Sequence, residues 1–86
     1  MKIYLAIVQE QQESTNTLSF SSVEDRDVGI KKYCMGKAPC RVKSSLEYQR
    51  HFLDDLEPEA LKNSEGFHYN DDYWFITALF GEIELS

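Results

Sequence analysis

Two runs of apolar, β-branched and aromatic residues, one near each end of the chain, constrain the fold more than any other feature of the sequence. Residues 2–8 (KIYLAIV) are apolar on both alternating faces, which predicts a central strand covered on both sides. Residues 73–80 (YWFITALF) form the most strand-like run and predict a second central strand. The chain is therefore expected to fold around a sheet.

Shorter segments beside these runs extend the predicted sheet. Residues 9–16 are wholly polar, and residues 17–20 (TLSF) then alternate, which predicts a short hairpin partner with one buried face. Near the other end, Gly81 predicts a bulge or a tight bend. Residues 82–85 (EIEL) alternate strictly after it, so a fourth, C-terminal strand is an alternative.

Two capping-box patterns predict two helices between the strands. Residues 21–24 (SSVE) place Ser21 as the first cap, and Gly36 marks the predicted end of that helix. Its predicted apolar arc consists of Val23, Ile30, Tyr33 and Cys34. Residues 37–41 are expected to form a loop because Pro39 disfavours helix in the residue before it.

The second helix begins at the pattern in residues 44–47 (SSLE) and separates into two faces. The predicted apolar face holds Leu46, Tyr48, Phe52, Leu53 and Leu56. The polar face holds Glu47, Arg50, His51, Asp54 and Asp55. Pro58 at the first helical position predicts a further turn that ends near Gly66, and residues 70–72 (NDD) predict a tight turn.

The order strand, strand, helix, helix, strand predicts an α+β fold, in which two helices pack on one face of a mainly antiparallel sheet. The chain has 86 residues, which is the length of one small domain, and it contains no repeat or linker that would divide it. We therefore expect a single domain over residues 1–86.

Charge and hydropathy limit the classes of partner. Nine basic against fifteen acidic residues give a net charge of −6, which disfavours direct binding to nucleic acid or to anionic lipid. No stretch approaches the roughly 20 apolar residues of a membrane span. We expect a soluble, cytoplasmic protein, and the negative field favours a basic protein partner.

The two cysteines predict no chemistry of their own. Cys34 and Cys40 are expected to be free thiols in a reducing compartment, and Cys34 lies on an apolar arc, where a thiol is buried and inert. His68 beside Asp71 and Asp72 is the one cluster that resembles a metal or acid–base site, but a solvated turn is the better interpretation. The sequence predicts no catalytic site, no cofactor and no bound metal, and hence a protein that is not an enzyme.

Short acidic groups recur along the chain, among them Glu24, Asp25 and Asp27, and later Glu82 and Glu84. These groups are consistent with an ordinary solubilising surface, or with a negative face that binds a basic groove such as one built to hold nucleic acid. The residues we assign to that partner-binding face are Asp54, Asp55, Glu57, Glu59, Asp71 and Asp72.

The compact, acidic and motif-free profile resembles, in composition alone, the small inhibitors, immunity proteins and anti-defence proteins of bacteria and their phages. That resemblance assigns a role to no particular residue. The leading hypothesis is an acidic module that occupies a basic surface of a larger protein. An accessory subunit or homodimer assembled through a sheet edge is the first alternative, and a small enzyme without a legible site is the second.

Overall fold

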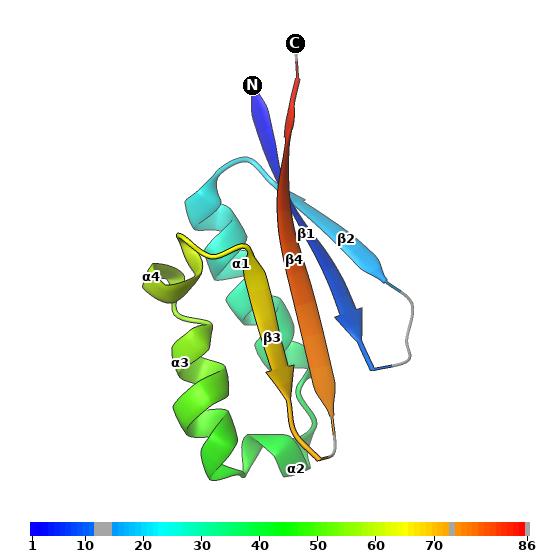
Figure 1. Cartoon of the computed structure of the whole chain (residues 1–86), viewed down its shortest axis with the longest axis vertical. Helices are drawn as coiled ribbons and strands as arrows, with labels where there is room; N and C mark the ends of the chain where they lie inside the picture. The colour runs from blue at the N-terminus through cyan, green and yellow to red at the C-terminus, as the bar shows by residue number, and fades with distance from the viewer. Residues whose placement is uncertain (12–14, 73, 86) are drawn as a thin grey trace.

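The computed structural model of the chain describes residues 1–11, 15–72 and 74–85 and confirms the α+β fold (Figure 1). The N-terminal half contains β1 (Lys2–Glu10), β2 (Asn16–Phe20), α1 (Val23–Lys37) and α2 (Cys40–Lys43). The C-terminal half contains η1 (Tyr48–Phe52), α3 (Leu53–Asp55), α4 (Pro58–Leu61), β3 (Gly66–Asn70) and β4 (Phe75–Glu84). Residues 12–14, part of the polar stretch between the first two strands, and Tyr73 lie outside the described residues.

The four strands form one antiparallel sheet in the order β2-β1-β4-β3. The predicted hairpin of β1 and β2 is confirmed, and β1 and β4 are the two central strands. They pair without interruption from Lys2 opposite Glu84 to Glu10 opposite Ile76. This long ladder forms the centre of the sheet.

The fourth strand is not where the sequence alternative placed it. Residues 82–84 continue β4 because Gly81 pairs with Leu5 inside the ladder and does not adopt a positive φ. The fourth strand is β3, a segment that the sequence analysis did not assign. Its signal was present, since Phe67 and Tyr69 are buried and alternate with exposed residues.

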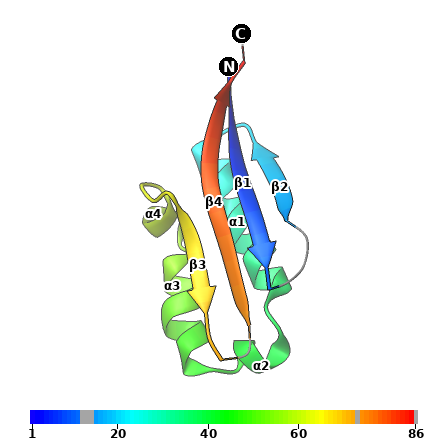
Figure 2. The same cartoon turned by 45° about the vertical axis from the view of Figure 1, so that its right-hand side comes forward.

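The helices lie on one side of the sheet, as predicted, with α1 behind the strands and α3 and α4 along the β3 flank (Figures 1 and 2). The expectation that β1 is covered on both sides is wrong. Ala6 and Val8 are buried under the helices, whereas Ile7, which points the opposite way, is 41% exposed. One whole face of the sheet is therefore left without a helical layer.

Phe52 occupies the centre of the core between the helical layer and the sheet. Its ring centroid lies 4.7 Å from that of Tyr48, 5.0 Å from Tyr69, 5.6 Å from Phe67 and 5.9 Å from Trp74. The last three rings come from β3 and from the residue just before β4. This aromatic cluster fastens the helical layer to that side of the sheet.

The boundaries of α1 differ from the predicted ones. Ser22, not Ser21, is the N-cap, and its Oγ accepts a hydrogen bond from the Asp25 N–H at 3.0 Å. The helix passes through Gly36 and ends at Lys37, because the extended backbone of Ala38 leads into Pro39. The tendency of Gly36 to end a helix is therefore weaker than the steric effect of Pro39 on the residue before it.

The segment after α1 also departs from the prediction. Residues 40–43 form the short helix α2 instead of a loop. Ser45, not Ser44, caps the next helical segment, accepting from the Tyr48 N–H at 3.1 Å. Leu46 then falls outside the core at 66% exposure, whereas Tyr48, Phe52 and Leu56 are buried as predicted.

Candidate functional site

Four of the six predicted partner-binding residues lie together on the helical flank of the domain. Asp54 and Asp55 are in α3, Glu57 follows it, and Glu59 is in α4; all four are exposed. The Glu57 carboxylate forms an ion pair with Lys31 Nζ of α1. Among the described residues, no ion pair involves the other three carboxylates. We call these four residues the acidic ridge.

The other two predicted residues, Asp71 and Asp72, lie in the turn between β3 and β4. Asp71 is half-buried and has a structural role, because one carboxylate oxygen accepts from the Trp74 N–H at 2.8 Å. The other accepts from the Tyr69 hydroxyl at 2.9 Å. Burial, together with the hydrogen bond to Asp71 and the charge of that residue, raises the pKa of Tyr69 to about 12. Only Asp72 of this pair is exposed.

A hollow of about 400 Å³ lies between the helical segment η1–α3 and the edge strand β3. It is lined by His51 and Asp55 on the helical side and by His68 and Asn70 on β3, so it lies between the acidic ridge and the start of the Asp71–Asp72 turn. The His68 Nδ1 lies 2.8 Å from Thr77 Oγ1 on the neighbouring strand. Within the described part of the chain, no three His, Cys, Asp or Glu side chains are grouped as metal ligands would be.

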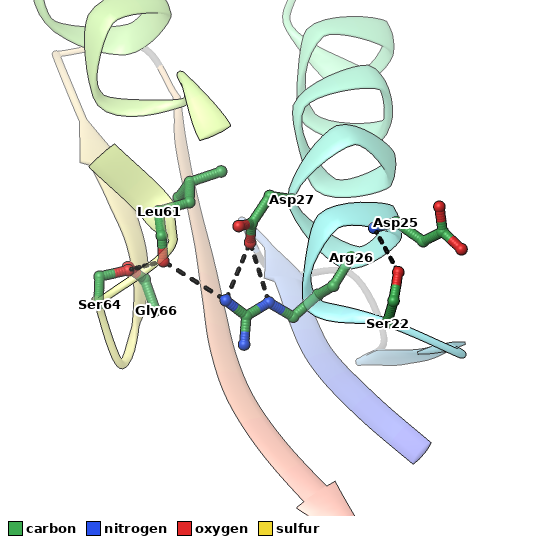
Figure 3. Close-up of polar contacts among 7 residues, drawn as sticks. All are labelled: Ser22, Asp25, Arg26, Asp27, Leu61, Ser64 and Gly66. Atoms are coloured by element: carbon green, nitrogen blue, oxygen red, sulfur yellow. Dashed lines mark hydrogen bonds and ion pairs between the residues drawn. The ribbon is translucent and has the colours of Figure 1, made fainter. Parts of the chain in front are cut away.

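Two adjacent residues of α1, Arg26 and Asp27, form a buried ion pair beside α4 (Figure 3). Arg26 donates from Nε and Nη2 to one Asp27 oxygen, at 3.0 and 2.9 Å, and its Nη2 also approaches the Leu61 carbonyl at 3.4 Å. The guanidinium lies 4.0 Å from the centre of the Phe80 ring. Asp27 is only 2% exposed, so its assignment to a surface acidic group is wrong.

Adjacent helical residues point in directions about 100° apart, so the periodicity of α1 does not indicate that Arg26 and Asp27 are buried together. Both are buried because residues of α4 and β4 pack against this part of α1. No local sequence signal predicts that approach.

Although the net charge of the chain is negative, one end of the molecule, which we call the basic end, is rich in cations. Residues 28–46 contain Lys31, Lys32, Lys37, Arg41 and Lys43 and no acidic residue. All but Lys31 are exposed. These cations lie on the C-terminal part of α1 and on α2, at the end of the molecule away from the chain termini (Figure 1). The charge of the protein is therefore unevenly distributed, and its surface is not uniformly negative.

Both cysteines are free thiols, as predicted. Cys34 is buried and Cys40 is exposed. Burial, with a smaller effect of the Glu10 charge, raises the pKa of the Cys34 thiol to about 12. Burial and the raised pKa both keep Cys34 in the thiol form at neutral pH, which makes it a weak nucleophile.

Comparison of the chain with protein-family models, with curated proteins and with solved structures found no match. Within the described ranges, none of the helices has the length and apolar character needed to cross a membrane.

Proposed function

We propose that this protein is a small acidic binding module that occupies a basic surface of a larger protein through the acidic ridge. The observation that carries this proposal is the state of Asp54, Asp55 and Glu59. All three carboxylates are exposed, and none forms an ion pair with another described residue. Their charge is therefore available to an external cation.

The fold supports this role by separating the charges. Of the five cations of the basic end, Lys31 alone forms an ion pair with a described residue of the ridge, through Glu57, so Asp54, Asp55 and Glu59 keep a negative local charge. Such a field speeds encounter with a basic partner and orients its approach. A groove that holds nucleic acid is the kind of surface that fits, because its cations already serve to neutralise closely spaced negative charges.

Charge reversal at two separate sites tests the proposal. The double variant Asp54→Lys/Asp55→Lys changes the net charge by four units without touching the core. Glu82→Lys/Glu84→Lys makes the same change on exposed residues of β4, where Glu84 pairs with the N-terminal amine. Because both variants have the same net charge, a difference between them reports the location of the binding surface. Circular dichroism would verify that both remain folded.

Tagged wild-type protein would first be used to isolate a partner from cells that express the chain. Association rates would then be measured for the three proteins at about 0.05 M and about 0.5 M salt, where the screening length differs severalfold. We expect the ridge variant to associate at least about tenfold more slowly at low salt and to lose most of the salt dependence. Equal rates for the ridge variant and the wild type would refute the proposal, as would a larger effect of the β4 variant.

A further inference from the structure

The side of the sheet that faces away from the helices, which we call the outer face, has an unusual composition. On the two central strands its positions are Ile3, Leu5, Ile7, Gln9, Phe75, Thr77, Leu79, Gly81 and Ile83. On the two edge strands they are Thr17, Ser19, Gly66, His68 and Asn70. The first set is mainly apolar, and the second is polar or small.

The apolar residues of the outer face form one stripe along its centre. Ile7 pairs with Leu79, and Ile3 pairs with Ile83, so these side chains are cross-strand neighbours. Leu79 is 60% exposed, Ile83 48% and Ile7 41%, and Leu5 beside them is half-buried. No helix crosses this side of the sheet in either view (Figures 1 and 2). A contiguous apolar stripe with a polar rim is the anatomy of a protein–protein interface.

The outer face also carries no Asp, Glu, Lys or Arg at any of these strand positions. Charged residues make up 28% of the chain, and the net charge is −6. The same strands bear Lys2, Glu10, Glu82 and Glu84 at positions of the opposite alternation. Two molecules of equal charge can stack such a neutral face without placing like charges opposite each other, whereas a strongly basic partner finds no carboxylate there.

A hollow beside the stripe adds shape to this face. It measures about 240 Å³ and is bordered by Leu79 and Thr77 of β4 and by Gly66 of β3. One charged residue, Glu65 just before β3, also borders it. Gly81 leaves an open position on the stripe, since an added Cβ would meet no atom within 4 Å. Each molecule thus presents both projecting leucine and isoleucine side chains and recesses that can receive them.

The size of the outer face suits a modest interface. At about 4.8 Å between strands and about 3.3 Å per residue, the paired strands project roughly 450 Å². Two such faces together bury on the order of 900 Å², before the relief of the side chains is counted, which is near the lower limit of about 1,000 Å² for a specific complex. An interface of this size belongs to the class of weak, reversible complexes.

We propose that the outer face is a homodimer interface, in which two copies of this chain stack their sheets face to face about a two-fold axis. The apolar stripe runs along the two central strands. A two-fold axis that lies in the plane between the two sheets, either parallel or perpendicular to the strands, therefore places the stripe of one copy on the stripe of the other, and the polar rim on the polar rim. The interface is therefore isologous. The product is a two-layer sandwich that buries Leu79 and Ile7 in both copies.

This geometry differs from assembly through a sheet edge. Both edge strands contain only five residues, so edge pairing would leave the exposed stripe uncovered. The inference does not depend on the proposed function, because the helices lie on the opposite side of the sheet from the interface. Stacking leaves both acidic ridges open, so the dimer would be a bivalent binder.

Sedimentation equilibrium of the full chain tests the inference, from about 1 μM to about 500 μM, a range that brackets a micromolar dissociation constant. We expect the wild-type mass to rise from 10.0 kDa toward twice that value with concentration. Leu79→Lys should raise the dissociation constant at least about 100-fold, because the two-fold axis introduces the substitution twice. Leu46→Lys is the matched control, since Leu46 is equally apolar and 66% exposed but lies on the helical side.

A second variant distinguishes loss of dimerisation from misfolding of the Leu79→Lys protein. Gly81→Lys adds a side chain and a charge to the stripe where the monomer has open space, so it should fold normally and fail to dimerise. Raising the salt concentration should strengthen the wild-type dimer, because two chains of charge −6 repel each other. Dissociation by salt would instead indicate pairing of the basic end with an acidic ridge, and would overturn the inference. It would also be overturned by a wild-type chain that stays monomeric up to the highest concentration, or by equal weakening in the Leu46→Lys control.

Discussion

Truncation of Phe52 to alanine tests the core that holds the helices on the sheet. Phe52 is fully buried, and its ring contacts those of Tyr48, Phe67, Tyr69 and Trp74. Removing a buried phenylalanine ring costs about 3–5 kcal/mol through lost transfer free energy and the remaining cavity. A domain of 86 residues has a total stability of roughly 4–13 kcal/mol, so this single change removes a large fraction of it.

The chain contains its own probe for this measurement. Trp74 is the single tryptophan, it is 4% exposed, and its ring lies 5.9 Å from Phe52. Urea unfolding followed by its fluorescence should show a midpoint lowered by roughly 1.5–5 M, given a slope of about 1–2 kcal/mol per M. The midpoint is the quantity to compare, because the substitution also alters the native-state emission of Trp74.

Two further variants separate the causes. Phe52→Leu keeps apolar bulk but loses the ring contacts, and we expect a cost of about 1–2 kcal/mol. Leu46→Ala changes an exposed leucine and should stay within about 0.5 kcal/mol of the wild type. If Phe52→Ala shifts the midpoint no more than Leu46→Ala does, the aromatic cluster is not the centre of the core.

Two predictions concern titratable side chains. In native protein, a thiol reagent should label Cys40 rapidly and Cys34 only after unfolding, and Cys34→Ser should cost about 1–3 kcal/mol while Cys40→Ser costs little; labelling of both thiols at one rate would contradict this. The pKa of Tyr69 is raised to about 12, above the value near 10 of an unfolded chain, so the neutral phenol contributes stability that is complete below pH 10 and is lost as the pH rises toward 12. Tyr69→Phe should therefore flatten the fall in melting temperature over that range, and an unchanged slope would refute the assignment.

Predictions from local patterns were accurate for most of the elements, although they missed α2 and β3. The apolar run of residues 2–8 identified a central strand, and the capping patterns identified both helical regions to within one residue at their starts. The polar face of the second helix placed Asp54 and Asp55 on the surface correctly. These features depend on contacts within a few residues, so the sequence contains the information directly.

The tertiary structure decided which apolar surfaces are covered and which carboxylates are exposed without an interaction partner among the described residues. An apolar residue such as Ile7 has the same sequence signature whether a helix covers it or solvent does, because alternation reports the side of a strand and not what lies against it. Asp27 and Asp71 look like surface carboxylates in the sequence, yet one pairs with buried Arg26 and the other closes a turn. These partners are local, since Arg26 adjoins Asp27 and Asp71 bonds residues two and three positions away, but only the assembly of α1, α4 and the sheet buries Arg26 and Asp27. The exposed apolar stripe exists because that assembly places every helix on the same side (Figures 1 and 2).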